Sequence, residues 1–244
     1  MTVSKKSLLI IPFYNECKRI SIGDFIADFT NFPNTDFLLV DDGSSDKTAA
    51  LLQNLSNGHP NVNAVVLSSN LGKAEAIRYA VQNTDLSAFD YVGYLDADLA
   101  TPIEELIKML AFAEKHPQYH FIMGSRIKKM GSTIVRYKHR HYLGRIFATI
   151  VSGFILKTPI YDTQCGAKII TKDIALQLFE KPFLTRWLFD IELLLRYKKT
   201  NPDFERQVYE FSLNTWIEKG ASKITFRDLI GFPMQLLKIY NAYA

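Results

Sequence analysis

Residues 90–115 read DYVGYLDADLATPIEELIKMLAFAEK and decide the fold class. The apolar run Asp90–Leu95 is typical of a short buried strand, and two carboxylates, Asp96 and Asp98, follow it directly. Apolar residues at helical spacing then predict a helix over Pro102–Lys115. A strand that is followed by a helix of this length is the repeating unit of an α/β fold.

The same alternation of strand and helix extends in both directions from this stretch. Further strands are predicted at Ser7–Ile11, Asp36–Val40, Asn63–Leu67, His120–Met123, Lys168–Thr171 and Val208–Leu213. Further helices are predicted near Ile20–Phe29, Asp46–Leu55, Lys73–Gln82, Lys172–Phe179 and Trp187–Lys199. Strands separated by helices of this length predict a mostly parallel sheet with helices on both faces.

Length and composition are those of one ordinary globular domain with a small appendage. The chain has 244 residues, 48% of them hydrophobic, and no linker rich in Pro, Gly or Ser divides it. We expect one α/β domain over residues 1–225, within which residues 127–160 differ in composition. Residues 226–244 form an amphipathic C-terminal tail, with apolar residues at helical spacing interrupted by Gly231 and Pro233.

Basic residues are concentrated in one part of the chain. The net charge is +4, but residues 126–161 contain eight Lys and Arg and no Asp or Glu. The apolar run Ile146–Leu156 in this stretch has 11 residues, fewer than the roughly 20 of a spanning helix. Cationic and aromatic residues beside an apolar helix are typical of a segment that lies on a membrane surface. A core helix with a solvated basic lead-in is the alternative, and nucleic-acid binding, which no recognised motif accompanies, is a third.

The sequence lacks the signatures of several other protein classes. Cys17 and Cys165 are not spaced for a zinc site, so we expect neither a disulfide framework nor a structural zinc, and a reducing compartment. No GxGxxG follows a strand, and Leu71-Gly72-Lys73 lacks the upstream glycine of a P-loop. These absences argue against a dehydrogenase and a P-loop ATPase.

Acidic residues follow three of the predicted strands. They lie in Pro12–Glu16, Asp41–Asp46 and Asp96–Asp98, and in an open α/β sheet such strand ends meet at the ligand-binding edge. Carboxylates gathered at one edge repel one another unless a cation lies among them. Asp96 and Asp98, at i and i+2 on an extended segment, point to the same side. Mg²⁺ or Mn²⁺ binds through one or two carboxylates plus substrate phosphates, so this pair predicts a metal-bound nucleoside diphosphate.

The motifs together resemble a known family. Those at the first strand ends resemble family-2 glycosyltransferases with a GT-A fold: Pro12-x-Tyr14-x-Glu16, Asp41-Asp42-Gly43-Ser44-x-Asp46-x-Thr48, Asn70-x-Gly72-Lys73 and Asp96-Ala97-Asp98. Later motifs are similar to those of polyprenyl-phosphate sugar synthases, and most of all of dolichyl-phosphate β-glucosyltransferases: Gly124-Ser125-Arg126, Asp162–Lys168, Arg186–Glu192 and Ser222-Lys223. The resemblance spans residues 8–223, and the motifs Asp162–Gly166 and Arg186–Glu192 are the more specific ones.

The resemblance implies roles for individual residues. The nucleotide sugar would be held by Pro12, Tyr14, Glu16, Val40, Asp42, Lys73, Asp96, Ala97 and Asp98. The metal ligands would be Asp96 and Asp98, and the catalytic residues would be Asp98, Arg126, Asp162, Asp190 and Glu192. Mannose-transferring relatives often have Gln where this chain has Ala100, which counts mildly against a mannosyl donor.

The chemistry of a lipid-phosphate acceptor fits these residues independently. The phosphate is already an anion at neutral pH, so a strong general base is dispensable. The site must instead neutralise two phosphates and hold them in line, for which Arg126, Arg136 and Lys223 are the candidate cations. Asp162 and the pair Asp190 and Glu192 orient sugar hydroxyls or arginines, or one of them is the base if the acceptor is a hydroxyl. Alternatively, Asp190 and Glu192 lie on a solvated helix face beside arginines.

We therefore predict an inverting, metal-dependent GT-A enzyme. It transfers a hexose, glucose first, from a nucleoside-diphosphate sugar, UDP first, to a polyprenyl or dolichyl phosphate. The alternatives are a family-2 transferase with a glycan or other hydroxyl acceptor, and a non-catalytic membrane-surface binding protein of the same fold. The expected location is the cytoplasm, peripheral at the inner face of the cell membrane. No nucleic-acid partner is expected, and a homo-oligomer is left open.

Overall fold

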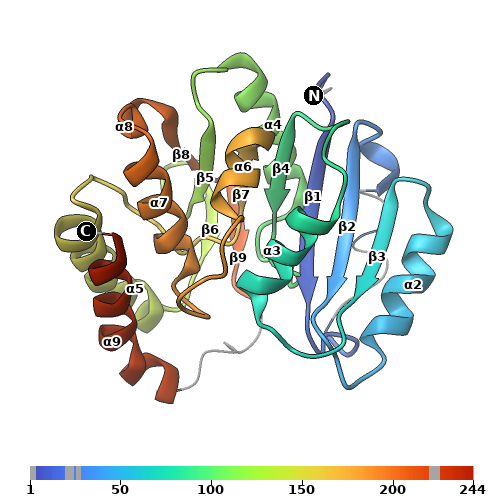
Figure 1. The fold of residues 1–244 in the computed structure, drawn as a ribbon, viewed down its shortest axis with the longest axis horizontal. Coiled ribbons are helices and arrows are strands. Elements are labelled where there is room, and N and C mark those ends of the chain that lie inside the picture. Colours follow the sequence, from blue (N-terminus) through green and yellow to red (C-terminus); the bar gives the residue numbers. More distant parts are fainter. Residues whose placement is uncertain (1–3, 20–24, 26–28, 220–225, 244) are drawn as a thin grey trace.

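A mostly parallel sheet of seven strands forms the centre of the described part of the chain (Figure 1). The computed structural model describes residues 4–19, 25, 29–219 and 226–243. The strands of this sheet are β1 (Ser7–Phe13), β2 (Thr35–Asp41), β3 (Val62–Val66), β4 (Tyr91–Tyr94), β5 (Phe121–Ser125), β7 (Lys168–Thr171) and β8 (Val208–Ser212). The predicted mostly parallel sheet is confirmed.

The strand order places a crevice next to β1. The order is β3-β2-β1-β4-β7-β5-β8, and within it β7 alone is antiparallel to its neighbours β4 and β5. The chain proceeds outward from β1 to β2 and β3, and then returns to the other side of β1 as β4. At such a reversal the loops that follow the two central strands diverge, and ligands of open α/β sheets bind there. The loops after Phe13 and Tyr94 therefore line the expected ligand edge.

Helices cover both faces of the sheet, as predicted. They are α2 (Thr48–Gly58), α3 (Lys73–Asn83), α4 (Ile103–Lys115), α6 (Lys172–Leu178), α7 (Phe189–Thr200) and the short α8 (Phe204–Gln207). Side chains alternate along β1, so that Leu8 and Ile10 join one core with α3, α6 and α7, and Leu9 and Ile11 join another with α2 and α4. Strands buried on both faces explain the nearly continuous apolar runs of the sequence. The helix predicted near Ile20–Phe29 lies largely outside the described residues.

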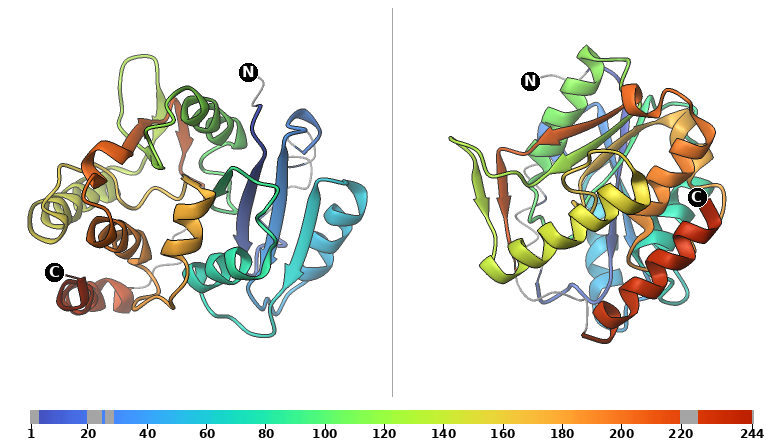
Figure 2. Two further views of the ribbon diagram at one scale, coloured as in Figure 1. Left: turned by 45° about the horizontal axis from the view of Figure 1, so that its top comes forward. Right: turned by 90° about the vertical axis from the view of Figure 1, so that its left-hand side faces the viewer.

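Two further helical segments lie side by side at one end of the molecule (Figures 1 and 2). Helix α5 (Lys138–Ile150) continues as a π-helical segment, η1 (Val151–Leu156), and α9 (Phe226–Tyr243) spans the predicted C-terminal tail. The rings of Phe147 and Phe232 join α5 to α9, with 5.9 Å between their centroids. None of the described helices is long and apolar enough to cross a membrane.

A second, two-stranded sheet was not predicted from the sequence. It pairs β6 (Thr133–Val135) with β9 (Thr215–Ile217) in parallel, next to the carboxyl end of β5. Both strands have only three residues, which is too short for an alternating pattern to stand out. The domain boundary predicted at residue 225 borders residues 220–225, which lie outside the described part, and it stays a prediction.

Candidate functional site

Asp96 and Asp98 lie in the loop that leaves the carboxyl end of β4, where the crevice is expected. The Nζ atom of Lys73, at the start of α3, lies 2.6 Å from Oδ1 of Asp96. Oδ1 of Asp98 accepts a hydrogen bond of 3.0 Å from the amide of Ala100. Leu99, between Asp98 and Ala100, has a φ of 49°, a left-handed conformation that turns the chain sharply after Asp98. The pair is therefore held by a tight turn and by one lysine.

The two carboxylates differ in their electrostatic surroundings. Burial by itself raises the pKa of Asp96, but the positive charges of Lys73, Lys168 and Arg126 outweigh this effect and lower it. Burial raises the pKa of Asp98, and the negative charge of Asp96 raises it further. The cationic partners of Asp96 thus lower its pKa, whereas the charges of Arg19 and Lys73 do not offset the effects that raise the pKa of Asp98.

A glycine from the neighbouring strand loop makes room for Asp96. A Cβ atom on Gly166 would lie 1.8 Å from Oδ2 of Asp96, so no side chain fits at this position. Gly166 precedes the antiparallel strand β7, which the sheet order places next to β4. The specific motif around Gly166 is therefore in direct contact with the metal-binding motif predicted at Asp96.

Asp190 supports the floor of the site rather than lying on a solvated helix face. It is 4% exposed, accepts a hydrogen bond of 2.7 Å from the Tyr94 hydroxyl, and lies 2.8 Å from Nζ of Lys168. Lys168 is fully buried and also donates to the carbonyl oxygens of Thr163 and Cys165. This network joins β4, β7 and α7 beneath the crevice. The solvated-face alternative for Asp190 is wrong, because its helix packs inward on the sheet.

Arg126 and Asp162 form a second charged centre, after the carboxyl end of β5. Asp162 accepts two bonds of 2.7 Å from the guanidinium of Arg126 and one of 3.1 Å from its amide. Burial opposes ionisation of Asp162, but Arg126 outweighs it and lowers the pKa of this carboxyl to about 2. The guanidinium also lies over the ring of Trp216 on β9, at 5.2 Å.

Arg136 lies near this centre and adds a second positive charge. Burial lowers the pKa of Arg136, and the neighbouring charge of Arg126 lowers it further. The charges of Asp162 and Glu218 act in the opposite direction on Arg136, so the two guanidinium groups and these carboxylates share one charged region. The third predicted phosphate cation, Lys223, lies outside the described residues.

The residues predicted to hold the nucleotide lie at the ends of β1 and β2. Pro12 and Val40 are in register as neighbours on these strands, and Tyr14 is half-buried in the following loop. Glu16 is 3% exposed, and its carboxylate lies 3.3 Å from Arg19. These four residues, predicted to bind the nucleotide sugar, thus lie at or just after the carboxyl ends of two neighbouring strands.

Asp42, also predicted to bind the nucleotide sugar, holds the loop before α3. Its two carboxylate oxygens accept hydrogen bonds from the amides of Leu71 and Gly72, at 2.7 and 2.8 Å. The adjacent Gly43 has a φ of +65°, and a Cβ there would lie 2.4 Å from the backbone of Ser69. Asp42 and Gly43 together hold the loop that leads to Lys73 against the end of β2.

Glu192 contacts residues that lie outside the predicted site. It is fully buried, and it accepts hydrogen bonds from the amide of Leu184, the guanidinium of Arg196 and the hydroxyl of Tyr243. None of these partners is a predicted site residue, and the geometry indicates a structural role that ties α7 to α9. The solvated-face alternative is wrong here too, although its ion pair with Arg196 is present.

Lys168 and Trp216 are site residues to which the sequence analysis gave no role. Lys168 interrupts an apolar run, which is a signal for a paired buried charge, but its partner is 22 positions away and on another element. Trp216 belongs to a strand too short to predict. Only the fold reveals what these two side chains contact.

The carboxylates fit a divalent metal that completes its coordination from a ligand. Among the described residues, no group of three or more His, Cys, Asp or Glu is placed to hold a metal ion. Asp96 and Asp98 are two carboxylates, and Mg²⁺ or Mn²⁺ held by one or two carboxylates takes its other ligands from phosphate oxygens and water. Asp98 is the better candidate for direct ligation, since Lys73 already occupies one oxygen of Asp96.

Comparisons with known proteins agree with this geometry. Residues 8–179 match the family model described as "Glycosyl transferase family 2". The dolichyl-phosphate beta-glucosyltransferase ALG5C of Trichomonas vaginalis is 30% identical over 94% of this chain and 69% of its own. The dolichyl-phosphate beta-glucosyltransferase of Drosophila melanogaster is 31% identical over 96% of this chain and 74% of its own.

A solved structure with a similar fold is glucosyl-3-phosphoglycerate synthase from Mycobacterium tuberculosis, in complex with Mn²⁺, UDP and phosphoglyceric acid. It superimposes with a TM-score of 0.70 at 14% identity, over 98% of this chain and 78% of that chain. The fold is accordingly that of the GT-A glycosyltransferases. The chain belongs to glycosyl transferase family 2 and is a glycosyltransferase.

Proposed function

We propose that the chain transfers glucose, with inversion, from UDP-glucose to a polyprenyl phosphate such as dolichyl phosphate. Relatives at 30% and 31% identity carry the name dolichyl-phosphate beta-glucosyltransferase. The mycobacterial protein of similar fold, glucosyl-3-phosphoglycerate synthase, has been solved with Mn²⁺, UDP-glucose and phosphoglyceric acid. These names support both the donor and the acceptor class.

The observation that carries the proposal is a pair of opposed charges at one sheet edge. Asp96 and Asp98 follow β4, Arg126 follows β5, and Asp96 and Arg126 are close enough that each shifts the pKa of the other. A leaving diphosphate and an attacking phosphate are both anions and must approach within bonding distance of the same carbon. A site for this reaction therefore needs cationic character on both sides of that carbon.

On the donor side, Asp96 and Asp98 would hold Mg²⁺ or Mn²⁺ together with the diphosphate. When bound, the ion neutralises charge that develops on the leaving diphosphate. Lys73 lies beside Asp96 and supplies a further cation from the protein itself. The pKa of Asp98 is raised, so a bound cation would stabilise its ionised form.

On the acceptor side, Arg126 and Arg136 would bind the lipid phosphate. Asp162 fixes the Arg126 guanidinium by two bonds, so that its remaining N–H groups face a defined direction. A carboxyl with a pKa of about 2 is a poor proton acceptor, and Asp162 is therefore a positioning residue rather than a base. A phosphate nucleophile requires no base, in agreement with this arrangement.

An exposed apolar surface beside the site would rest on the membrane that holds the acceptor. On α5 and η1 it consists of four side chains at intervals of four, Tyr142, Ile146, Ile150 and Phe154. On α9 it consists of Leu229, Ile230, Met234 and Leu237. We name these eight residues the apolar face. The surrounding stretch 126–161 is basic without a single acid, which suits anionic headgroups and supports a peripheral location at the cytoplasmic side.

The test is transfer of labelled glucose into lipid. Purified protein, UDP-[¹⁴C]glucose and Mn²⁺ are incubated with vesicles that contain dolichyl phosphate, with Asp98→Asn as the inactive control. We expect an organic-extractable, acid-labile product from the parent and none from the variant. Label in a water-soluble glycan instead would favour a hydroxyl acceptor. Binding of UDP without turnover of any nucleotide sugar would favour a non-catalytic protein.

A further inference from the structure

Residues 161 and 162 lie outside the helices and strands, and they contact α5, Arg126 and β8. The ring of Tyr161 lies under the guanidinium of Arg145 on α5, at 4.2 Å. The next residue, Asp162, holds Arg126 by three hydrogen bonds. The position of this short segment therefore determines where the Arg126 guanidinium lies.

Glu210 on β8 fixes this segment. Its Oε2 accepts a hydrogen bond of 2.8 Å from the amide of Tyr161, and its Oε1 accepts one of 2.8 Å from the amide of Asp162. Two consecutive backbone amides are thus held by the two oxygens of one carboxylate. Both bonds involve an ionised acceptor, which makes them stronger than bonds between neutral groups.

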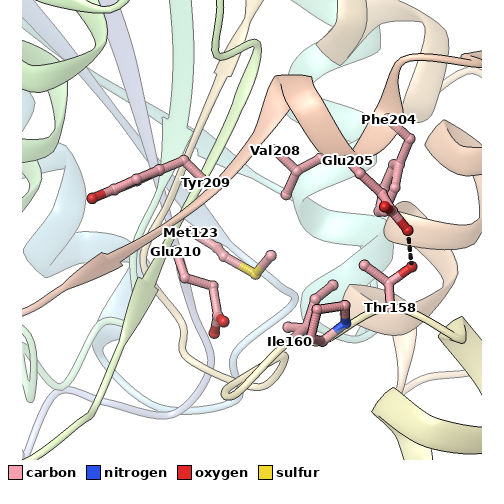
Figure 3. A pocket seen from close by; sticks show the side chains of 9 residues that line it. Met123, Thr158, Ile160, Phe204, Glu205, Val208, Tyr209 and Glu210 are labelled. Atoms are coloured by element: carbon pink, nitrogen blue, oxygen red, sulfur yellow. Dashed lines mark hydrogen bonds between the residues drawn. The ribbon is translucent and has the colours of Figure 1, made fainter.

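Glu210 reaches the segment from outside the candidate site. It lines a cavity of about 240 Å³ between β5, β8 and residues 158–160, and none of the residues predicted for the site lines that cavity. Both Glu210 and Tyr209 line the cavity, and Figure 3 shows their side chains leaving β8 in different directions. Tyr209 stacks on Phe112 of α4 on the opposite face, at 4.5 Å. Because side chains alternate along β8, Tyr209 packs against α4 and Glu210 reaches residues 161 and 162 on the other face.

We propose that Glu210 is a positioning residue for acceptor binding, which acts through the 161–162 backbone and Asp162 to hold Arg126 in place. The inference rests on the proposed function, in which Arg126 binds the acceptor phosphate. A carboxylate offers two acceptor oxygens, and here each amide has one of them. A glutamine at this position has one acceptor oxygen, and its NH₂ group meets an N–H donor. One amide is then left without its acceptor, and the segment is free to shift.

The first experiment compares Glu210→Gln with Glu205→Gln. Glu205 lines the same cavity, but its Oε1 accepts from the Thr158 hydroxyl and not from the segment (Figure 3). With farnesyl phosphate as a soluble acceptor, we expect Glu210→Gln to raise the acceptor KM about tenfold. The affinity for UDP in the presence of Mn²⁺ should stay within about twofold of the parent value, and Glu205→Gln should leave both quantities unchanged.

A merely structural role predicts another pattern. Partial unfolding lowers the active fraction, and therefore kcat, without a selective change in the acceptor KM. An unchanged acceptor KM in Glu210→Gln, or an equal loss of donor affinity, overturns the inference. Glu210→Asp keeps the charge and both oxygens on a shorter stem, and its acceptor KM should fall between those of the parent and Glu210→Gln.

A second readout does not depend on turnover. The Nε–H group of Arg126 donates to Asp162, and its NMR signal in ¹⁵N-labelled protein is assigned by its loss in Arg126→Lys. We expect this signal to shift in Glu210→Gln and to stay in place in Glu205→Gln. If the parent transfers no glucose to any prenyl phosphate, the proposed function fails while this signal still tests the role of Glu210. An unshifted signal overturns the inference.

Discussion

Two aspartates of the site have opposite pKa shifts, and the difference assigns their roles. The pKa of Asp98 is raised by burial and by the negative charge of Asp96. The pKa of Asp162 is lowered to about 2, because the charge and hydrogen bonds of Arg126 outweigh the effect of burial. A carboxylate that is already paired inside the protein positions its partner, whereas one whose pKa stays raised despite nearby cations gains from an added cation. Asp162 is thus a support for Arg126, and Asp98 is the metal ligand that we propose.

The lowered pKa of Asp162 predicts how the stability of the fold depends on pH. Its pKa falls from 3.8 to about 2, so its contribution is complete above pH 3.8 and is lost as the pH falls through 2. We expect Asp162→Asn to lower the free energy of unfolding by about 2 kcal/mol at neutral pH. The difference from the parent should shrink between these two pH values in urea titrations.

An exposed carboxylate gives the control for this prediction. Asp173 lies at the start of α6, and Asp173→Asn should change the free energy of unfolding by less than about 0.5 kcal/mol. A penalty for Asp162→Asn of the same size at neutral and strongly acid pH contradicts the assigned ion pair.

At the residue scale, the sequence singled out individual residues but not their contacts. Asp98, Arg126 and Asp162 were singled out because their motifs follow strands or match a family. The roles of Lys168 and Glu210 were not predicted, because their functional contacts are with residues distant in sequence. A hydrogen bond between β8 and residues 161–162 spans nearly fifty positions and leaves no periodic trace in the chain.

At the scale of elements, α9 is bound to the core by a polar contact at its end. Tyr243 donates to Glu192 at 2.8 Å and accepts from Arg196 at 3.1 Å, both on α7. Ile239, one turn earlier, is fully buried. The C-terminal half of α9 is therefore fixed, although exposed apolar residues dominate the helix as a whole.

This contact predicts the cost of losing one hydroxyl. Tyr243→Phe leaves the buried Glu192 and Arg196 without one partner each, and should lower the free energy of unfolding by about 1–2 kcal/mol. Tyr240→Phe, on the same helix, removes a hydroxyl for which the structure gives no hydrogen bond, and should cost less than about 0.5 kcal/mol. Equal effects of the two variants in urea unfolding contradict the role given to Tyr243.

The strands of the main sheet were predicted well from short apolar runs in the sequence. The strand Lys168–Thr171 was predicted with its observed bounds, and the other strands of the main sheet differ by one or two residues at their ends. The antiparallel direction of β7 was not specified, since the direction of a strand depends on its neighbours in space. The π-helical segment η1 also escaped prediction, because its apolar composition fits an ordinary helix equally well.

At the scale of the whole molecule, the apolar face and the candidate site belong to one body. Arg145 on α5 packs on Tyr161, and Tyr161 precedes the aspartate that holds Arg126. A membrane under α5 and α9 would thus lie close to the acceptor side of the site. A long-chain lipid phosphate could then reach Arg126 with its chain still in the bilayer.

This arrangement predicts a selective loss of membrane binding. Ile146 and Phe154 are 60% and 72% exposed, and Ile146→Glu with Phe154→Glu should weaken binding to phosphatidylserine vesicles by at least about tenfold. Leu176→Glu, at a 40% exposed position on α6, is the control and should bind as the parent does. Co-sedimentation measures the bound fraction. Equal loss in both proteins, or no loss in either, contradicts the assigned face.

The central claim is that Asp98 and a divalent cation together bind the diphosphate of the donor. Calorimetric titration of UDP into the protein, with Mn²⁺ and with a chelator, tests it most directly. We predict that the parent binds UDP at least about tenfold more tightly with Mn²⁺, and that Asp98→Asn loses this gain. Equal affinities of the parent with and without Mn²⁺ would contradict the account.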